Sequence, residues 1–148
     1  MRKWLIVSWM SSVFLLGPHC LAAPLFESTL GVNHHFTQDA VRDAKDIADT
    51  AVAGFHLIRY DMIWESVERS KGIYDFSVYD RLLEQMSAQS IRPMFILDYG
   101  NHLYGDSLSA RTPKSREAFA KFAAAAAARY RGKNTIWEIW NEPNIDRF

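Results

Sequence analysis

The chain has 148 residues, of which 49% are hydrophobic and 14% are aromatic, so it is long enough to bury the core of one ordinary domain. Its 17 basic and 17 acidic residues exclude the strongly basic face that a nucleic-acid partner requires. Cys20 is the only cysteine, which excludes a disulfide within residues 24–148.

Residues 1–23 predict a signal peptide. A basic start, Met1-Arg2-Lys3, precedes a mostly apolar stretch over 4–16 and small residues at 21–23. The apolar stretch is too short for a membrane span, and Gly17-Pro18 interrupts it. We therefore expect a secreted or periplasmic chain with a formal charge of −2 and no membrane contact after signal removal. The exact cleavage site stays open, and lipidation at Cys20 or an uncleaved anchor are the alternatives.

Beyond the signal, strand and helix patterns alternate. We expect strands at 29–33, 55–59, 93–97 and 137–140, and helices at 38–53, from 75 or 77 to 90, and from 115 to about 132. The inward helical positions are predicted to be 41, 44, 47, 48 and 51, then 79, 82, 83 and 86, then 119, 122 and 130. Strands separated by helices indicate a parallel sheet with right-handed crossovers, either a barrel or a doubly wound sheet. No glycine-rich phosphate-binding motif is present, so a nucleotide cofactor is unsupported.

Asn141-Glu142-Pro143 follows the last predicted strand. Strict strand alternation would point Asn141 and Glu142 to opposite faces, so both serve one site only if the chain kinks there. Glu142 could be a general acid and base, a role that requires a carboxyl kept protonated near neutral pH. Asn141 could donate to a sugar hydroxyl. The alternatives are a carboxylate that caps the strand end and an ordinary turn residue.

Arg59 ends the second predicted strand, where a buried cation needs a carboxylate partner. Two interpretations stay open. Arg59 either orients and ionises a catalytic carboxylate, or it forms a structural salt bridge to Asp61 or Asp98.

Four further residues are candidates for sugar contacts: His35, Trp64, Tyr99 and Asn101. Trp64 lies among polar residues and is the best candidate for stacking on a sugar ring, although tryptophan is also an ordinary core residue. Adjacent histidines on a strand, such as His34 and His35, point in opposite directions and seldom share an ion. We expect neither a metal nor any other cofactor.

Five segments in this order resemble clan A glycoside hydrolases, in particular the cellulase-type family 5 and the xylosidase-type family 39. They are Gly31-Val-Asn-His34, residues 53–59 followed by Asp61 and Trp64, residues 72–80, residues 93–97, and Trp140-Asn-Glu-Pro143. The resemblance implies that residues 24–148 are the N-terminal half of a (β/α)8 barrel, with strands one to four and helices one to three. It also implies Glu142 as the acid/base, Asn141 as the contact to the 2-hydroxyl, and Arg59 near the nucleophile.

In the clan the nucleophile is a second glutamate after strand seven, and no glutamate of this sequence matches that position. We therefore expect a piece of a retaining glycosidase for a β-linked poly- or oligosaccharide that is inactive alone. Its open barrel edges would favour self-association. The alternatives are a non-catalytic carbohydrate-binding or assembly module, and a doubly wound sheet with an unrelated ligand.

Overall fold

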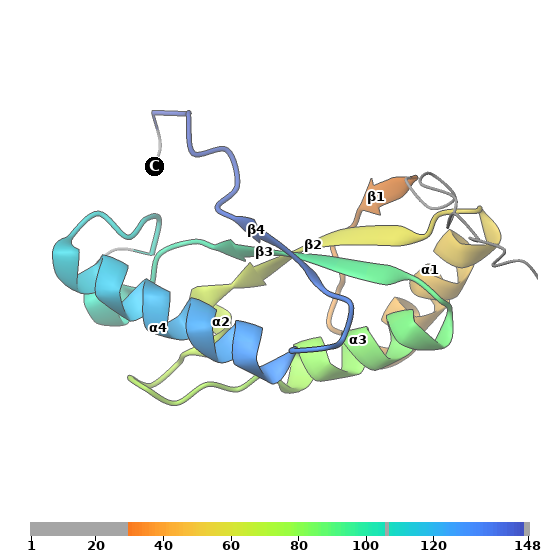
Figure 1. The fold of residues 1–148 in the computed structure, drawn as a ribbon, viewed down its shortest axis with the longest axis horizontal. Coiled ribbons are helices and arrows are strands. Elements are labelled where there is room, and N and C mark those ends of the chain that lie inside the picture. Colours follow the sequence, from red (N-terminus) through yellow and green to blue (C-terminus); the bar gives the residue numbers. More distant parts are fainter. Residues whose placement is uncertain (1–29, 106, 147–148) are drawn as a thin grey trace, which may run out of the picture.

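The computed structural model describes residues 30–105 and 107–146, so the predicted signal peptide of residues 1–23 lies outside the described residues. Strands and helices alternate along the chain (Figure 1). The strands are β1 (Gly31–Asn33), β2 (Leu57–Ile63), β3 (Arg92–Asp98) and β4 (Ile136–Ile139). The helices are α1 (Ala40–Val52), α2 (Trp64–Val67), α3 (Ser77–Ala88), the 3-10 turn η1 (His102–Tyr104) and α4 (Pro113–Arg129).

The four strands form one sheet in the order β1-β2-β3-β4, and every neighbouring pair is parallel. The prediction of parallel strands in chain order is therefore confirmed. A doubly wound sheet reverses its strand order at a switch point, and this sheet does not. An isolated antiparallel bridge between Ser70 and Ile73 lies in the loop after α2 and joins no two strands.

The core lies between one face of the sheet and the helices (Figure 1). Alternate residues of β2 point to this face, and Ile58, Tyr60 and Met62 are buried there. The predicted inward residues of α3 are confirmed, because Tyr79, Leu82, Leu83 and Met86 are all buried. The opposite face of the sheet carries no helix in the described part of the chain.

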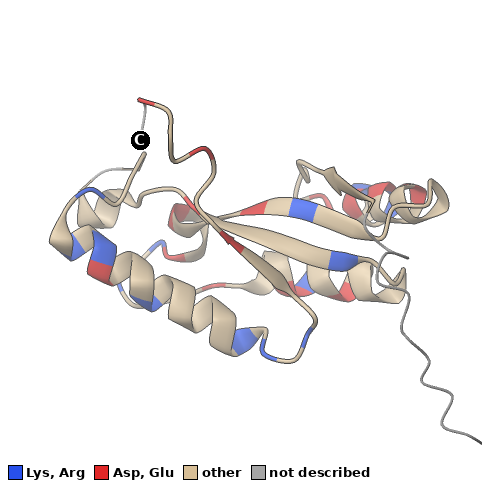
Figure 2. Ribbon diagram, turned by 45° about the horizontal axis from the view of Figure 1, so that its top comes forward, with Lys and Arg blue, Asp and Glu red and all other residues tan. Residues whose placement is uncertain are grey.

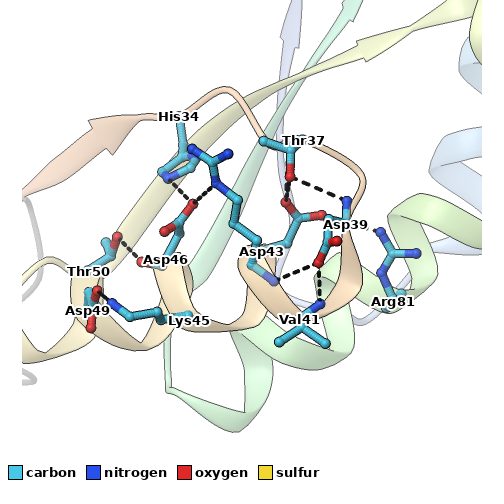
Figure 3. Close-up of polar contacts among 11 residues, drawn as sticks. His34, Thr37, Asp39, Val41, Asp43, Lys45, Asp46, Asp49, Thr50 and Arg81 are labelled. Carbon is cyan, nitrogen blue, oxygen red and sulfur yellow. Dashed lines mark hydrogen bonds and ion pairs between the residues drawn. The ribbon is translucent and has the colours of Figure 1, made fainter.

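The expected inward face of α1 is only partly right. Ile47 is buried, but Val41 is 83% exposed, and the other buried residue is Asp43. Figure 3 shows the reason: the Thr37 amide and hydroxyl donate to Asp43 Oδ1 at 2.9 and 3.1 Å, and Arg81 donates to Oδ2 at 3.3 Å. Asp43 thus links α1 to α3 and lies on the buried face of the helix with Ile47, although the sequence pattern did not place it there.

Two boundaries differ from the expected ones in ways that affect the site. The second strand continues to Ile63, so Arg59 lies inside β2 and not at its end. The predicted loop after it begins with the short helix α2, whose first residue, Trp64, is fully buried. No helix within residues 30–105 and 107–146 is both long and apolar enough to cross a membrane.

Candidate active site

An ion pair crosses the face of the sheet that has no helix. Arg59 on β2 binds both carboxylate oxygens of Glu138 on β4, with two nitrogen–oxygen distances of 2.7 Å. The strand between them, β3, contributes Ile96, which is paired with Asp61 on one side and Glu138 on the other. Arg59 therefore reaches across β3. In Figure 2 both basic and acidic residues lie within the strands of the sheet. The hydrogen bonds from Arg59 hold the pKa of Glu138 below its usual value.

Arg59 also binds two amides at this end of the sheet. It donates to Asn33 Oδ1 at 3.0 Å and to Asn141 Oδ1 at 2.9 Å. Asn141 Nδ2 in turn donates to the Tyr99 hydroxyl at 3.2 Å. Through these contacts Arg59 on β2 is linked to β1 and β4. Asn141 extends the network to Tyr99, which follows β3. The predicted partner of Arg59, Asp61 or Asp98, was wrong: the ion pair is with Glu138.

The backbone kinks where β4 ends, as a shared role for Asn141 and Glu142 requires. Trp140 and Glu142 have φ values of 70° and 48°, in the left-handed region that residues other than glycine rarely adopt. Strand alternation therefore stops at Ile139. Glu142 is exposed, and the loop around it rises from the sheet (Figure 1). Burial raises the pKa of the Tyr99 hydroxyl, and the hydrogen bond from Asn141 opposes this shift.

Asp98 lies at the end of β3. It is fully buried, and neither carboxyl oxygen has a hydrogen-bond partner within the described residues. Burial raises the pKa of Asp98 to about 8. The charge of Asp61 adds to this shift and that of Arg59 opposes it. Burial likewise raises the pKa of Asp61.

His35 lies at the rim of the site. Its side chain is 77% exposed, and its Nδ1 is 4.0 Å from Asp61 Oδ2. Its Nε2 is 3.4 Å from Asn33 Nδ2. A sugar contact by His35 or Tyr99 stays a prediction. Among residues 30–105 and 107–146, no group of three or more His, Cys, Asp and Glu residues could hold a metal ion.

The structure contradicts the surface role expected for Trp64 and Asn101. Trp64 is fully buried, its Nε1 donates to Glu68 at 2.6 Å, and its ring stacks on Tyr104. Asn101 is 1% exposed and donates to the Glu68 carbonyl at 2.8 Å. Both side chains pack in the interior and not on the surface. For Trp64 the reason is that α2 begins at this residue and directs its side chain into the core. Their polar sequence neighbours gave no sign of this.

A family model identifies the family of this chain, and solved structures share its fold. The sequence matches the model of the cellulase family, glycosyl hydrolase family 5, over residues 23–147. A family 39 glycoside hydrolase from the gut symbiont Bacteroides cellulosilyticus WH2 is 29% identical with a TM-score of 0.67. The match covers 77% of this chain and 24% of that one. No curated protein matches the chain.

Two further structures share the fold at lower identity. The endo-1,4-β-mannanase from Rhizomucor miehei is 18% identical with a TM-score of 0.62, over 80% of this chain and 45% of that one. The endoglucanase Cel5A from Pseudomonas stutzeri is 21% identical with a TM-score of 0.58, over 72% of this chain and 39% of that one. The chain therefore spans less than half of each of these structures, and its four strands correspond to the first half of a TIM barrel.

Proposed function

Because the chain belongs to the cellulase family, glycosyl hydrolase family 5, we propose that it forms part of an exported, retaining glycosidase. The reaction is hydrolysis of the O-glycosyl bonds of a β-linked poly- or oligosaccharide. The observation that carries this proposal is the hydrogen bond between Arg59 and Asn141 at the kinked end of β4. Export rests on the signal-like residues 1–23 and gives a secreted or periplasmic protein.

The hydrogen bonds fix how Asn141 meets a sugar. Its side-chain oxygen accepts from Arg59, so the amide nitrogen faces the other way, toward Tyr99. An amide nitrogen has two hydrogens, and the Tyr99 hydroxyl takes one of them. The second is available to a sugar hydroxyl next to the scissile bond. Arg59 acts here as a positioning residue for Asn141.

Glu142 supplies the proton in this proposal. It donates a proton to the leaving oxygen in the first step and accepts one from the attacking water in the second. A retaining mechanism also needs a carboxylate nucleophile about 5 to 5.5 Å from the acid/base. Glu138 is committed to Arg59, and Asp98 is fully buried. We propose that the nucleophile comes from outside residues 24–148.

Residues 24–148 alone are therefore expected to hydrolyse no β-glycan at an enzyme-like rate. One acid contributes about 10²- to 10⁴-fold, whereas enzymes accelerate their reactions by about 10⁶-fold or more. Reducing-sugar and aryl β-glycoside assays on this chain and on its Glu142→Gln variant test the expectation. Robust turnover that disappears in the variant would require a second carboxylate within the chain, and Asp98 and Glu65 would be the first to replace.

Where a longer preparation containing this chain does hydrolyse an aryl β-glycoside, Glu142→Gln should lower kcat about 10²- to 10⁴-fold. For a dinitrophenyl leaving group, which needs little protonation, kcat/KM should fall much less than for a poor leaving group, because kcat/KM reports the first step, in which Glu142 acts as the acid. Glu117→Gln, an exposed residue of α4, is the matched control. An equal loss of kcat/KM for both leaving groups would indicate that Glu142 does not act as the acid.

Self-association is the expected behaviour of residues 24–148. In the described chain β1 and β4 are edge strands, and Ile139 on β4 is 60% exposed. An open apolar edge pairs readily with another strand. Sedimentation velocity should show concentration-dependent oligomers, and Ile139→Lys should reduce them. A monodisperse monomer that unfolds cooperatively would contradict this prediction.

A further inference from the structure

Asp98 differs from the other buried carboxyl groups of the described chain. Asp43 accepts hydrogen bonds from Thr37 and Arg81, and Glu68 accepts three from its neighbours. Asp98 is as buried as both, yet neither of its oxygens has a partner in the described part of the chain. Buried polar groups are nearly always paired, and an unpaired carboxylate is costly to bury. Burying a carboxyl group without a hydrogen-bond partner costs far less free energy when the group is protonated and neutral.

The charges around Asp98 also favour its neutral form. Strand register and alternation put Asp98 on the same face of the sheet as Arg59 and Asp61 of β2 and Glu138 of β4, because Ile96, two residues before it, is paired with Asp61 and Glu138. Tyr99 follows it in the chain, and His35 lies beyond Asp61 at the rim. The guanidinium of Arg59 is already shared between Glu138, Asn33 and Asn141. An ionised Asp98 would thus be a third carboxylate beside a single committed cation.

We propose that Asp98 is a positioning residue that must keep its proton for Arg59 to hold Asn141 in place. When Asp98 releases this proton to solvent, its carboxylate competes for the guanidinium, and Arg59 leaves Asn141 Oδ1. The amide of Asn141 then loses the contact that orients it. The consequence for sugar binding rests on the proposed function, whereas the consequence for the Arg59–Asn141 contact does not. The raised pKa of Asp98, about 8, agrees with the geometry.

The direct test follows the Asn141 side-chain amide by nitrogen-15 NMR between pH 6 and pH 9.5. We expect its signals to move with a single midpoint near 8 and to stay constant in Asp98→Asn. Asp61→Asn should shift the midpoint to lower pH, because it removes a neighbouring negative charge. Glu117→Gln is the control and should leave the midpoint unchanged. Constant signals in the unmodified chain, or an unchanged midpoint in Asp98→Asn, would overturn the proposal.

A second measurement needs no variant and therefore does not depend on whether Asp98→Asn folds. The carboxyl carbon of Asp98, labelled with carbon-13, should report a neutral carboxyl group at pH 6.5 and titrate near pH 8. Ionisation already complete at pH 6.5 would overturn the proposal.

Sugar binding separates this proposal from the proposed function. Titration of the chain with cellotetraose and mannotetraose at pH 6.5 and pH 9 should give about tenfold weaker binding at pH 9, because only a minor fraction of the protein then keeps the proton. Equal affinity at both pH values would reject the role of Asp98 and leave the proposed function intact. No binding at either pH, with the NMR titration as expected, would reject the sugar site and leave Asp98 as the group that controls Arg59.

Discussion

Glu68→Ala is expected to lower the free energy of unfolding by about 3 to 5 kcal/mol, because it leaves one buried donor and two partly buried donors without an acceptor. Glu68 is fully buried and joins three segments. Its Oε2 accepts from Trp64 Nε1 at 2.6 Å, and its Oε1 accepts from the Gly72 amide and the Tyr104 hydroxyl, each at 2.6 Å. A loss of this size is a large part of the stability of a small domain.

Thermal and urea unfolding of Glu68→Ala and Glu68→Gln measure this effect. Glutamine keeps one acceptor oxygen but turns an NH2 group toward one of the donors. Glu68→Gln should therefore lower the free energy of unfolding, but by less than Glu68→Ala does. Glu65→Ala, in the helix α2 that directly precedes Glu68, is the matched control. Glu65 pairs with the exposed His102, and removing such a surface pair should cost less than about 1 kcal/mol. Equal losses for Glu65→Ala and Glu68→Ala would show that Glu68 does not hold these segments together.

Arg59→Met is expected to destabilise the chain by about 2 to 4 kcal/mol and to abolish sugar binding. Methionine keeps the length of the side chain but leaves Glu138 without its cation, and breaking such a pair costs more than the pair contributes. It also removes the hydrogen bond to Asn141. Urea unfolding at pH 7 gives the stability, and titration with cellotetraose gives the binding.

The stability that is lost in Arg59→Met should depend on pH, and it should be larger at pH 7 than at low pH. Arg59 lowers the pKa of Glu138, so the stability from this pair is present above the unfolded pKa and is lost as the pH falls through the folded one. The unfolded pKa of a glutamate is about 4.3. Arg59→Met and the unmodified chain should therefore differ at pH 7 and converge as the pH is lowered below 4. A difference that is constant from pH 7 to pH 3 would show that the loss is one of packing and not of charge.

The double variant Arg59→Met, Glu138→Leu separates stability from function. Replacing both charges by apolar groups removes the unpaired carboxylate, and such replacements are often neutral or stabilising. We expect the double variant to regain most of the stability lost in Arg59→Met. It should not regain sugar binding, because Asn141 still lacks the donor that orients it. Recovery of binding would contradict the positioning role of Arg59.

The sequence alone was sufficient for the order of the elements, and it placed Asn141 and Glu142 directly after the last strand, whereas their roles in a site stay predictions. Alternation of apolar strand and helix patterns depends on local spacing, so it predicted four parallel strands and the inward face of α3. Asn141 and Glu142 were visible because polar residues directly after a buried strand lie at one edge of a parallel sheet. A shared role for the two residues requires a kink, because strand alternation would point them to opposite faces, and Trp140 and Glu142 have the positive φ values of such a kink.

Only the tertiary structure decided which charges meet. Arg59 and Glu138 are 79 residues apart, and their contact depends on the register of two strands across a third, which sequence spacing does not contain. Burial of Asp98 and Trp64 likewise depends on what covers each residue. Local pattern determines which residues can form a strand or helix, whereas the pairing and pKa of a charged group depend on neighbours that folding brings together.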